Sequence, residues 1–579
     1  MAKEVIMPKA GMDMKEGTII KWLVNVGDDV KEGDALLEIE TDKVTMEVEA
    51  PSSGKLLCRY FEDGAVVPVV TVIAYVGASG ETVPDSPSIA GIKPAAEAPK
   101  PANVQAAPEA KPVDAPVAKH SYEYDAAIIG GGPAGYVAAI RAAQLGGKVI
   151  LFEKDVLGGV CLNRGCIPTK TYLKTAEHIH NIKYASSRGI LVDASSLGVD
   201  MEKVHAYKQQ VVGKLTGGVG VLLKSQQVTV INGLAKMAGP NQVQCEGKTY
   251  EAANIILCGG SKAGSVPIKG IENKRVVTSD EILDLTTVPR RLAIIGGGVI
   301  GCEIAIAFSA FGSEVTIIEV MDRVVPMMDA EISQAIGLAL KRARIKVLCG
   351  KQVEQIADGN DAAVLQLAGG DVVEAETVLL SVGRSADTEC LGNMAEKINS
   401  ERGRIVVDEY CKTSVPNIYA CGDLTSVSSL AHSAFVMGET AAANAMGHSE
   451  KADLSKIPSC LYTMPEAASV GLTEEEAKKT GEILVGRFPF SANGRSIASG
   501  EKDGFVKVIA DKRFGEILGV HIVGGIATEM IMEAKILMDM ESTIYEAAKI
   551  MYAHPTYSEA LAEACNDALG KCIHLPKLK

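Results

Sequence analysis

Two cysteines in the segment "GGVCLNRGCIPTK", residues 158–170, have a spacing that suits redox chemistry. Four residues separate Cys161 from Cys166, and a helical stretch would bring the two about one turn apart. A disulfide across so short a loop would add little stability, so its expected use is redox. A metal site is disfavoured because the nearest further ligands, His178 and His180, are two residues apart and do not share a helix face.

A lysine in the segment "EIETDKVTMEVEA", residues 38–50, has a different setting. Apolar residues alternate on both sides of it, which predicts two half-buried strands, and the polar residues 41–43 predict a tight turn between them. Lys43 is therefore expected at a hairpin tip, in water. On this segment alone, an ordinary solubilising lysine is an equally good interpretation.

A repeated glycine motif predicts two dinucleotide sites. The segment from Asp125 is echoed by the segment from Arg291: each is an apolar strand, a GxGxxG turn, a helical stretch and a second strand that ends in an acid. The glycines are Gly130, Gly132 and Gly135 in the first copy and Gly296, Gly298 and Gly301 in the second. Glu153 and Glu319 each follow 18 residues after the last glycine. Such turns let a pyrophosphate approach a helix N-terminus while the acid binds a ribose.

The elements that carry these residues fall into separate parts of the chain. Residues 1–78 are short alternating strands with turn signals, which predicts a small all-β domain. Residues 79–121 are rich in Ala and Pro without an apolar face, which predicts a linker. At about 3.1 Å per residue, proline-stiffened chain of this length could span about 100 Å. The repeats that follow predict an α/β protein.

Composition narrows the functional classes. The chain has 579 residues, a net charge of -14, 47% hydrophobic and 22% charged residues, which fits an α/β protein of several domains and disfavours nucleic acid or anionic membrane as partners. No apolar run reaches membrane-spanning length, and no signal or transit peptide is indicated. Thirteen cysteines without a dense framework suit a reducing compartment, so a cytoplasmic location is expected.

From residue 124 onward the sequence resembles the flavin-dependent pyridine nucleotide-disulfide oxidoreductases, and among them the branch that oxidises dihydrolipoamide. The resemblance rests on the two glycine motifs, the cysteine pair, "IYACGD" at residues 418–423 and "HPTYSE" at residues 554–559. It implies two Rossmann-like domains, for FAD and NAD, and an α+β dimerisation domain. The expected boundaries are residues 122–265 and 389–456 for FAD, 266–388 for NAD and 457–579 for dimerisation.

The resemblance assigns a set of residues to tightly bound FAD and to the redox centre. Cys161 and Cys166 would form the redox disulfide, with Cys161 meeting the substrate thiolate and Cys166 beside the flavin. The residues implied for FAD are Gly130, Gly132, Gly135, Glu153, Lys170, Ala235, Asp423 and Ala431.

The second motif would bind the nicotinamide cofactor. The residues implied for it are Gly296, Gly297, Gly298, Gly301, Glu303, Glu319, Val353 and Gly383. Glu319 would favour the free ribose diol of NAD and repel a 2′-phosphate, and the "VMD" that follows lacks the basic residues that NADP would need. Glutathione and mercuric reductases are thereby disfavoured.

The C-terminal motif implies an acid/base pair and a homodimer. His554 would act as acid/base and Glu559 would orient it, and in the family this histidine reaches the disulfide of the other subunit. A His and a Glu five residues apart are not specific by themselves, and a structural histidine is the alternative that the surrounding motif disfavours.

The N-terminal segment resembles a lipoyl domain, a small flattened barrel or sandwich in which the hairpin-tip lysine carries lipoic acid. Lys43 would therefore be lipoylated. Biotin domains have a methionine on each side of that lysine, whereas Asp42 and Val44 stand here. The expected activity is oxidation of protein-bound dihydrolipoamide, with a lipoyl-bearing acyltransferase component of a 2-oxo acid or acetoin dehydrogenase complex as partner.

Some segments depart from the family pattern. "LCGGS" at residues 257–261 stands for a usual Ala-Thr-Gly-Ser, "VGRSADT" lacks the usual proline, and Ala235 replaces a common glycine. Two rival functions stay open at this stage. One is a related flavin enzyme with another disulfide substrate, and the other is a non-catalytic lipoyl carrier, which the intact cysteine and histidine motifs disfavour.

Overall fold

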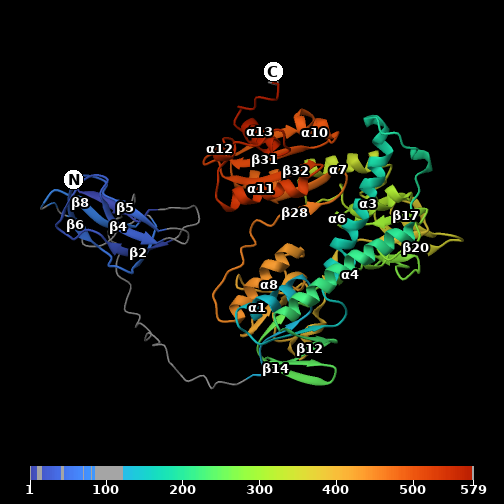
Figure 1. Ribbon diagram of the computed structural model, residues 1–579, viewed down its shortest axis with the longest axis horizontal. Helices are drawn as coiled ribbons and strands as arrows, with labels where there is room; N and C mark the ends of the chain where they lie inside the picture. Colours follow the sequence, from blue (N-terminus) through green and yellow to red (C-terminus); the bar gives the residue numbers. More distant parts are fainter. Residues whose placement is uncertain are drawn as a thin grey trace. The chain divides into compact units, whose positions relative to one another are not determined.

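The computed structural model describes residues 2–8, 16–40, 45–69, 71–79, 81, 83–84 and 122–576. The chain divides into two compact units, Met1–Val117 and Ala118–Lys579, shown with sequence colouring in Figure 1. The predicted linker, residues 79–121, lies outside the described residues except for positions 79, 81, 83 and 84. Within the described ranges, no helix is long and apolar enough to cross a membrane.

The first unit is a sandwich of two four-stranded antiparallel sheets, as its alternating pattern predicted. Side chains from both sheets, such as Ile19, Leu37, Leu56 and Val76, fill one core. One sheet has the order β1 (Lys3–Ile6), β8 (Val72–Gly77), β6 (Gly54–Arg59) and β3 (Asp29–Val30). The other has the order β5 (Thr45–Glu49), β4 (Ala35–Glu40), β2 (Glu16–Trp22) and β7 (Val66–Pro68).

The predicted hairpin of the first unit is formed by β4 and β5. The two strands pair antiparallel, with Glu40 opposite Thr45. Residues 41–44, which connect them and include Lys43, lie outside the described residues.

The second unit begins with a sheet that carries the first glycine motif. Its parallel strands are β11 (Thr229–Asn232), β10 (Val149–Glu153), β9 (Tyr124–Ile129), β14 (Lys248–Leu257) and β27 (Ile418–Ala420). β13 (Gln242–Cys245) and β12 (Ala235–Gly239) extend it in antiparallel fashion. The helices around it are α1 (Pro133–Gln144), α2 (Gly159–Arg164), α3 (Cys166–Tyr184), α4 (Met201–Ser225) and α8 (Ala431–Ala445). The buried face of α1 is mostly alanine, which allows the helices to pack closely.

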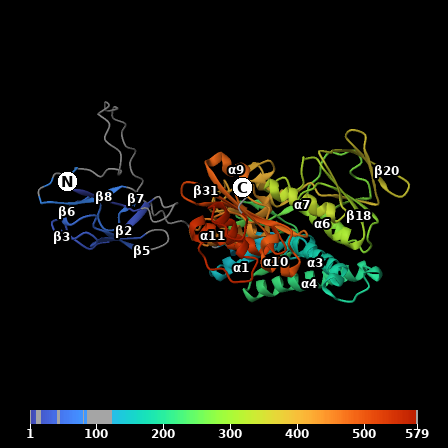
Figure 2. The ribbon, with the colours of Figure 1, turned by 90° about the horizontal axis from the view of Figure 1, so that it is seen from above.

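A second parallel sheet repeats this plan for the second glycine motif. Its order is β16 (Val276–Thr278), β23 (Thr377–Leu380), β17 (Arg291–Ile295), β18 (Glu314–Glu319) and β19 (Lys346–Cys349). Its helices are α5 (Ser279–Ile282), α6 (Val299–Phe311) and α7 (Ala330–Arg342), and Figure 2 shows α6 and α7 next to β18. A small sheet of β20 (Val353–Asp358), β21 (Ala363–Leu367) and β22 (Val372–Ala375) lies beyond β19 in the sequence.

Short strand pairs join these two regions. β15 (Ser261–Ala263) leaves the first sheet and pairs antiparallel with β24 (Arg384–Ala386), which returns to it. A further pair follows, β25 (Ser400–Glu401) with β26 (Arg404–Ile405).

The C-terminal region is an antiparallel sheet of α+β type. Its order is β28 (Ser459–Leu461), β29 (Glu466–Gly471), β32 (Ile517–Gly524), β31 (Phe505–Asp511) and β30 (Ile483–Pro489). The helices α11 (Ala527–Asp539) and α13 (Glu559–Ala568) pack on this sheet and are drawn in red in Figure 1. The remaining helices are α9 (Glu474–Thr480), α10 (Gly494–Ser499) and α12 (Ile544–Ala547).

Candidate active site and cofactor sites

Cys161 and Cys166 lie on two different helices. The sequence predicted one helical stretch, but the helix breaks at Gly165, whose φ of -137° and ψ of -108° are not helical. Cys161 is in α2 and Cys166 is the first residue of α3, and the two side chains still meet, because the Cys161 thiol donates a hydrogen bond to the Cys166 sulfur. Cys161 is half-buried and Cys166 is exposed.

The two sulfurs are not electrostatically equivalent. The hydrogen bond from Cys161 lowers the pKa of the Cys166 thiol, and the nearby Lys170 ammonium lowers it further. Donation of that hydrogen bond and burial raise the pKa of the Cys161 thiol. A reduced pair would therefore keep its proton on Cys161 and its negative charge on Cys166.

Lys170 is held at the junction of three segments. Its Nζ is 2.8 Å from Oε2 of Glu303 on α6, and it lies 4.3 Å from the centroid of the Tyr462 ring. Oε1 of Glu303 accepts a hydrogen bond from the Tyr462 backbone N–H at 3.0 Å. The almost completely buried Glu303 thus ties the redox helix α3 to α6 and to the segment after β28.

The predicted acid/base pair is formed. His554 Nδ1 is 2.8 Å from Oε1 of Glu559, the first residue of α13, and the other carboxylate oxygen accepts the Thr556 backbone N–H at 2.8 Å. Burial acts to raise the pKa of Glu559, but the bonds from Thr556 and His554 outweigh it and hold that pKa below its usual value. A carboxylate at Nδ1 leaves Nε2 of the exposed ring to exchange a proton.

Among the described residues, no hydrogen bond or ion pair connects His554 or Glu559 to Cys161 or Cys166.

The two glycine turns have the same geometry. The first glycine of each, Gly130 and Gly296, has a φ above 100°, which favours glycine. A Cβ on the third glycine of either turn, Gly135 or Gly301, would lie about 2 Å or less from the carbonyl oxygen of the first. A Cβ on the second, Gly132 or Gly298, would meet no atom closer than 3.7 Å. The turns are therefore crowded on the protein side and open where a phosphate would approach.

The helix that follows each turn lacks a side-chain cap. Gly132 caps α1 and Gly298 caps α6 with nearly equal angles, φ of -72° and -75° and ψ of -171° in both. No side chain accepts a hydrogen bond from the first N–H groups of either helix. The N–H groups and the positive end of each helix suit a pyrophosphate, so both turns fit a dinucleotide.

The acid of each copy is built into its turn. Glu153 accepts hydrogen bonds from the backbone N–H groups of Gly131 at 2.7 Å and Asp155 at 2.8 Å. Glu319 accepts the same pair of bonds, from Gly297 at 2.6 Å and Met321 at 2.8 Å. Both carboxylates are buried at the ends of their strands, where lone pairs not used by these bonds can accept from a ribose.

The other residues predicted for the cofactors have varied surroundings. Oδ2 of Asp423 accepts a hydrogen bond from Ser261 Oγ at 2.5 Å. Ala235 and Val353 are buried at the starts of β12 and β20, Ala431 is the first residue of α8, and Gly383 has a φ of +97° before β24.

Sequence reasoning did not identify Tyr462, Ser261 or Arg384 as parts of these sites. Arg384 donates from Nε to Ser261 Oγ at 2.8 Å, although 123 residues separate them. No spacing in the sequence signals a contact across such a distance; the only hint is that both residues lie in segments that depart from the family pattern.

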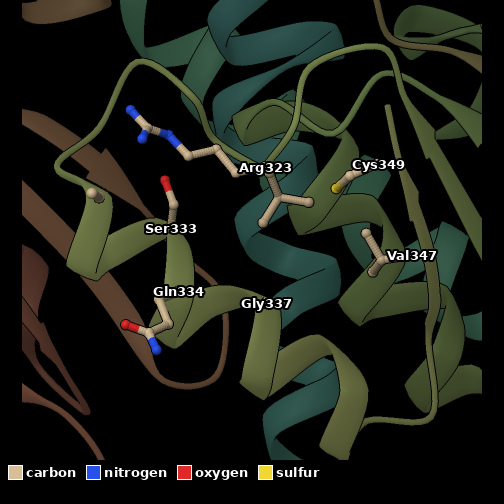
Figure 3. Close-up of a pocket in the computed structure, with 8 residues that line it drawn as sticks. Arg323, Ser333, Gln334, Gly337, Val347 and Cys349 are labelled. Carbon is tan, nitrogen blue, oxygen red and sulfur yellow. The ribbon is translucent and has the colours of Figure 1, made fainter. Parts of the chain in front are cut away.

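A separate cavity of about 360 Å³ lies between α7 and β19. Figure 3 shows Ser333, Gln334 and Gly337 from the helix on one side, Val347 and Cys349 from the strand on another, and Arg323 from the segment that follows β18. None of the predicted site residues lines it. In the part of the chain that the structure describes, no cluster of His, Cys, Asp or Glu residues could hold a metal ion.

Comparison with known families assigns most of the chain. The family described as pyridine nucleotide-disulphide oxidoreductase matches residues 124–438, and its dimerisation domain matches residues 457–565. The family described as biotin-requiring enzyme, which covers biotin and lipoyl domains, matches residues 3–76. The chain therefore belongs to the pyridine nucleotide-disulphide oxidoreductases, which use FAD and NAD, and carries an N-terminal domain of the biotin/lipoyl type.

Individual relatives narrow the comparison. A dihydrolipoyl dehydrogenase of Bacillus subtilis is 40% identical over 472 residues, which cover 78% of this chain and 99% of the relative. One from Thermus scotoductus is 40% identical over 461 residues, with the same coverage. Among solved structures, the HOCl-induced flavoprotein disulfide reductase RclA of Escherichia coli is 27% identical with a TM-score of 0.69, and LpdA of Mycobacterium tuberculosis is 25% identical with a TM-score of 0.71. Each covers 76% of this chain and 99% of its own.

Proposed function

We propose that this chain is an NAD-dependent dihydrolipoyl dehydrogenase. The observation that carries the proposal is the placement of Cys161 and Cys166 on two helices that break at Gly165, beside the Lys170 ammonium, which lowers the pKa of the Cys166 thiol. When a thiolate attacks a disulfide, the sulfur with the lower thiol pKa is the better leaving group. The pair is thus suited to accept two electrons from a dithiol through attack at Cys161.

The exchange chemistry balances within the protein and its substrate. One thiolate of dihydrolipoamide attacks Cys161, the bond between Cys161 and Cys166 breaks, and Cys166 leaves as a thiolate beside Lys170. The second substrate thiol then displaces Cys161, so that lipoamide leaves as a cyclic disulfide and the two protein cysteines are reduced. The first glycine turn would hold FAD and the second would hold NAD⁺, and together they would supply the two-electron acceptor that reoxidises the cysteines.

His554 serves as the base for the substrate thiols, with Glu559 holding its Nδ1. Because no hydrogen bond or ion pair among the described residues joins this pair to the cysteines of its own chain, the proposal includes a homodimer in which each subunit supplies the base for the other. Exposed apolar side chains support such an interface: Met532, Ile536 and Met540 recur at intervals of four along and just after α11.

The N-terminal domain supplies a lipoyl group on Lys43 in this proposal. The match to biotin and lipoyl domains and the pairing of β4 with β5 support that position. The partner is the lipoyl-bearing acyltransferase component of a 2-oxo acid or acetoin dehydrogenase complex. We place the protein in the cytoplasm, where reduced thiols persist.

The test is NADH formation from NAD⁺ with dihydrolipoamide, run beside reduced glutathione. We expect turnover with dihydrolipoamide only, and its loss in Cys166→Ser. Cys58→Ser, which changes a cysteine in β6 of the N-terminal unit, should leave turnover intact. Equal turnover of glutathione would point instead to a general disulfide reductase, and turnover unaffected by Cys166→Ser would refute the proposed redox centre.

A further inference from the structure

A chain of hydrogen bonds leads from the second dinucleotide region to the carboxylate of Asp423. Arg384 Nη1 donates to Oδ1 of Asp280 on α5 at 3.0 Å. Its Nε donates to Ser261 Oγ at 2.8 Å and its Nη2 to the Ser261 carbonyl oxygen at 3.0 Å. Ser261 Oγ donates in turn to Oδ2 of Asp423 at 2.5 Å. The Arg384 side chain is only 13% exposed, so solvent screens these bonds little.

The direction of these hydrogen bonds follows from which of the side chains can donate and which can accept. A guanidinium only donates hydrogen bonds and an ionised carboxylate only accepts them. The N–H of Arg384 therefore occupies the Ser261 oxygen as an acceptor, and the single hydroxyl proton must point to Asp423. A serine alone would be free to rotate its hydroxyl, whereas this one is committed to the carboxylate.

A second arginine fixes the backbone around the same carboxylate. Arg404 Nη1 donates to the carbonyl oxygens of Asp423 at 2.8 Å and Thr425 at 3.1 Å, and its Nη2 donates to the Arg384 carbonyl oxygen at 3.1 Å. The carbonyl group of Asp423 is thus held by Arg404 and not by the Arg384 side chain. The part left to Arg384 is the orientation of the Asp423 side chain.

We propose that Arg384 is a positioning residue for FAD: acting through Ser261, it holds the Asp423 carboxylate ready to bind the flavin cofactor. This inference rests on the proposed function, which places Asp423 in the flavin site.

The test measures FAD retained by the purified full-length holoenzyme after serial dilution and ultrafiltration. Arg384→Met should weaken FAD retention about tenfold or more, because it removes a charge-assisted bond from an enclosed chain. Ser261→Ala should have a similar effect, whereas Ser261→Thr keeps the hydroxyl and should retain FAD. Lys262→Met, an exposed neighbour on β15, controls for the loss of one positive charge.

Non-additivity distinguishes positioning from a general loss of stability. If Arg384 acts through Ser261, the double variant Arg384→Met/Ser261→Ala should retain as much FAD as Ser261→Ala alone. Fully additive losses, or retention in Arg384→Met equal to that of the unchanged protein, would overturn the inference. If Arg384→Met does not fold, as judged by circular dichroism, the inference is tested by comparing Ser261→Ala with Ser261→Thr. Equal FAD retention in these two variants would refute the role of the hydrogen bonds through Ser261.

One more variant separates this inference from the proposed function. Asp423→Ala should release FAD. If Asp423→Ala releases FAD and Arg384→Met does not, only the positioning role of Arg384 is refuted. If Asp423→Ala retains FAD fully, the proposed flavin site itself is wrong.

Discussion

The hydrogen bond from Cys161 should control the reactivity of Cys166 in the reduced protein. That bond is the largest cause that lowers the pKa of Cys166 from an ordinary 9.0 to about 7. At pH 7 about half of the Cys166 thiols would then be thiolate, against about one in a hundred at an unshifted pKa, a difference of about fiftyfold. Because Cys166 is exposed, solvent reduces the effect, and we expect Cys161→Ala to slow its alkylation at pH 7 by at least about tenfold.

The assay follows iodoacetamide labelling of the reduced protein under anaerobic conditions. Arg164 lies between the two cysteines, so trypsin places Cys166 in its own peptide, residues 165–170, which mass spectrometry can follow separately from the other cysteines. The pH at which labelling of Cys166 is half-maximal should rise in Cys161→Ala, because a lowered pKa keeps the thiolate at lower pH. Cys161→Ser retains a donor and should stay near the original rate. If Ser slows labelling as much as Ala, or if Ala has no effect, the hydrogen bond does not set the reactivity.

Four further outcomes are expected. His554→Gln should reduce dihydrolipoamide oxidation by about 10² to 10⁴ while transfer from NADH to an artificial acceptor, which needs no thiol base, continues; unchanged thiol turnover would exclude the base role. Glu319→Ala should narrow the preference for NAD over NADP in kcat/KM by removing a charge that repels a 2′-phosphate, and equal kcat/KM in the unchanged protein would contradict it. Lys43→Arg should remove a lipoyl mass seen in protein from a lipoate-competent host and leave oxidation of free dihydrolipoamide intact; an unmodified Lys43 in the parent would refute lipoylation. Lys507→Met should lower the free energy of unfolding in urea by about 3 to 5 kcal/mol, because Lys507 is 2% exposed and lies within 3.0 Å of three carboxylates, and a loss below about 1 kcal/mol would show that those charges do not depend on it.

The sequence predicted the parts of the fold that depend on the spacing of residues close together in the chain. The glycine turns, the strands that precede them and the acids that follow are each set by spacing within about thirty residues, and Glu153 and Glu319 indeed lie at the ends of their strands. The alternation around residues 38–50 likewise predicted the paired strands β4 and β5. The helix break at Gly165 was not predicted, because two cysteines with four residues between them are also compatible with one continuous helix.

The rest of the candidate site, and the buried ion pairs of the fold, depend on contacts between residues far apart in the sequence. The Lys507 cluster joins β31 to Asp329 at the start of α7 over 178 residues, and Lys170 meets Glu303 over 133. Charged residues at such separations have no common period in the sequence, and their pairing follows only when separate elements pack together. Burial then makes the pairing obligatory, since an isolated charge in these positions would be costly.

The two copies of the glycine motif show how one scaffold serves two purposes. In each copy the carbonyl oxygen of the residue after the first glycine accepts a backbone N–H from the chain beyond the acid: Gly158 donates to Gly131, and Val325 donates to Gly297, both at 2.8 Å. The two copies thus have the same backbone arrangement up to this hydrogen bond and differ in the residues that follow it. In the first copy a second glycine, Gly159, follows, and a Cβ there would lie 2.7 Å from the Cα of Gly132. Only glycine lets the chain pass this close to the turn before entering α2, whose third residue is Cys161. The two cysteines are therefore placed next to the first turn by a local feature that the second copy lacks, which explains physically why the cysteine pair accompanies the proposed flavin site and not the nicotinamide site.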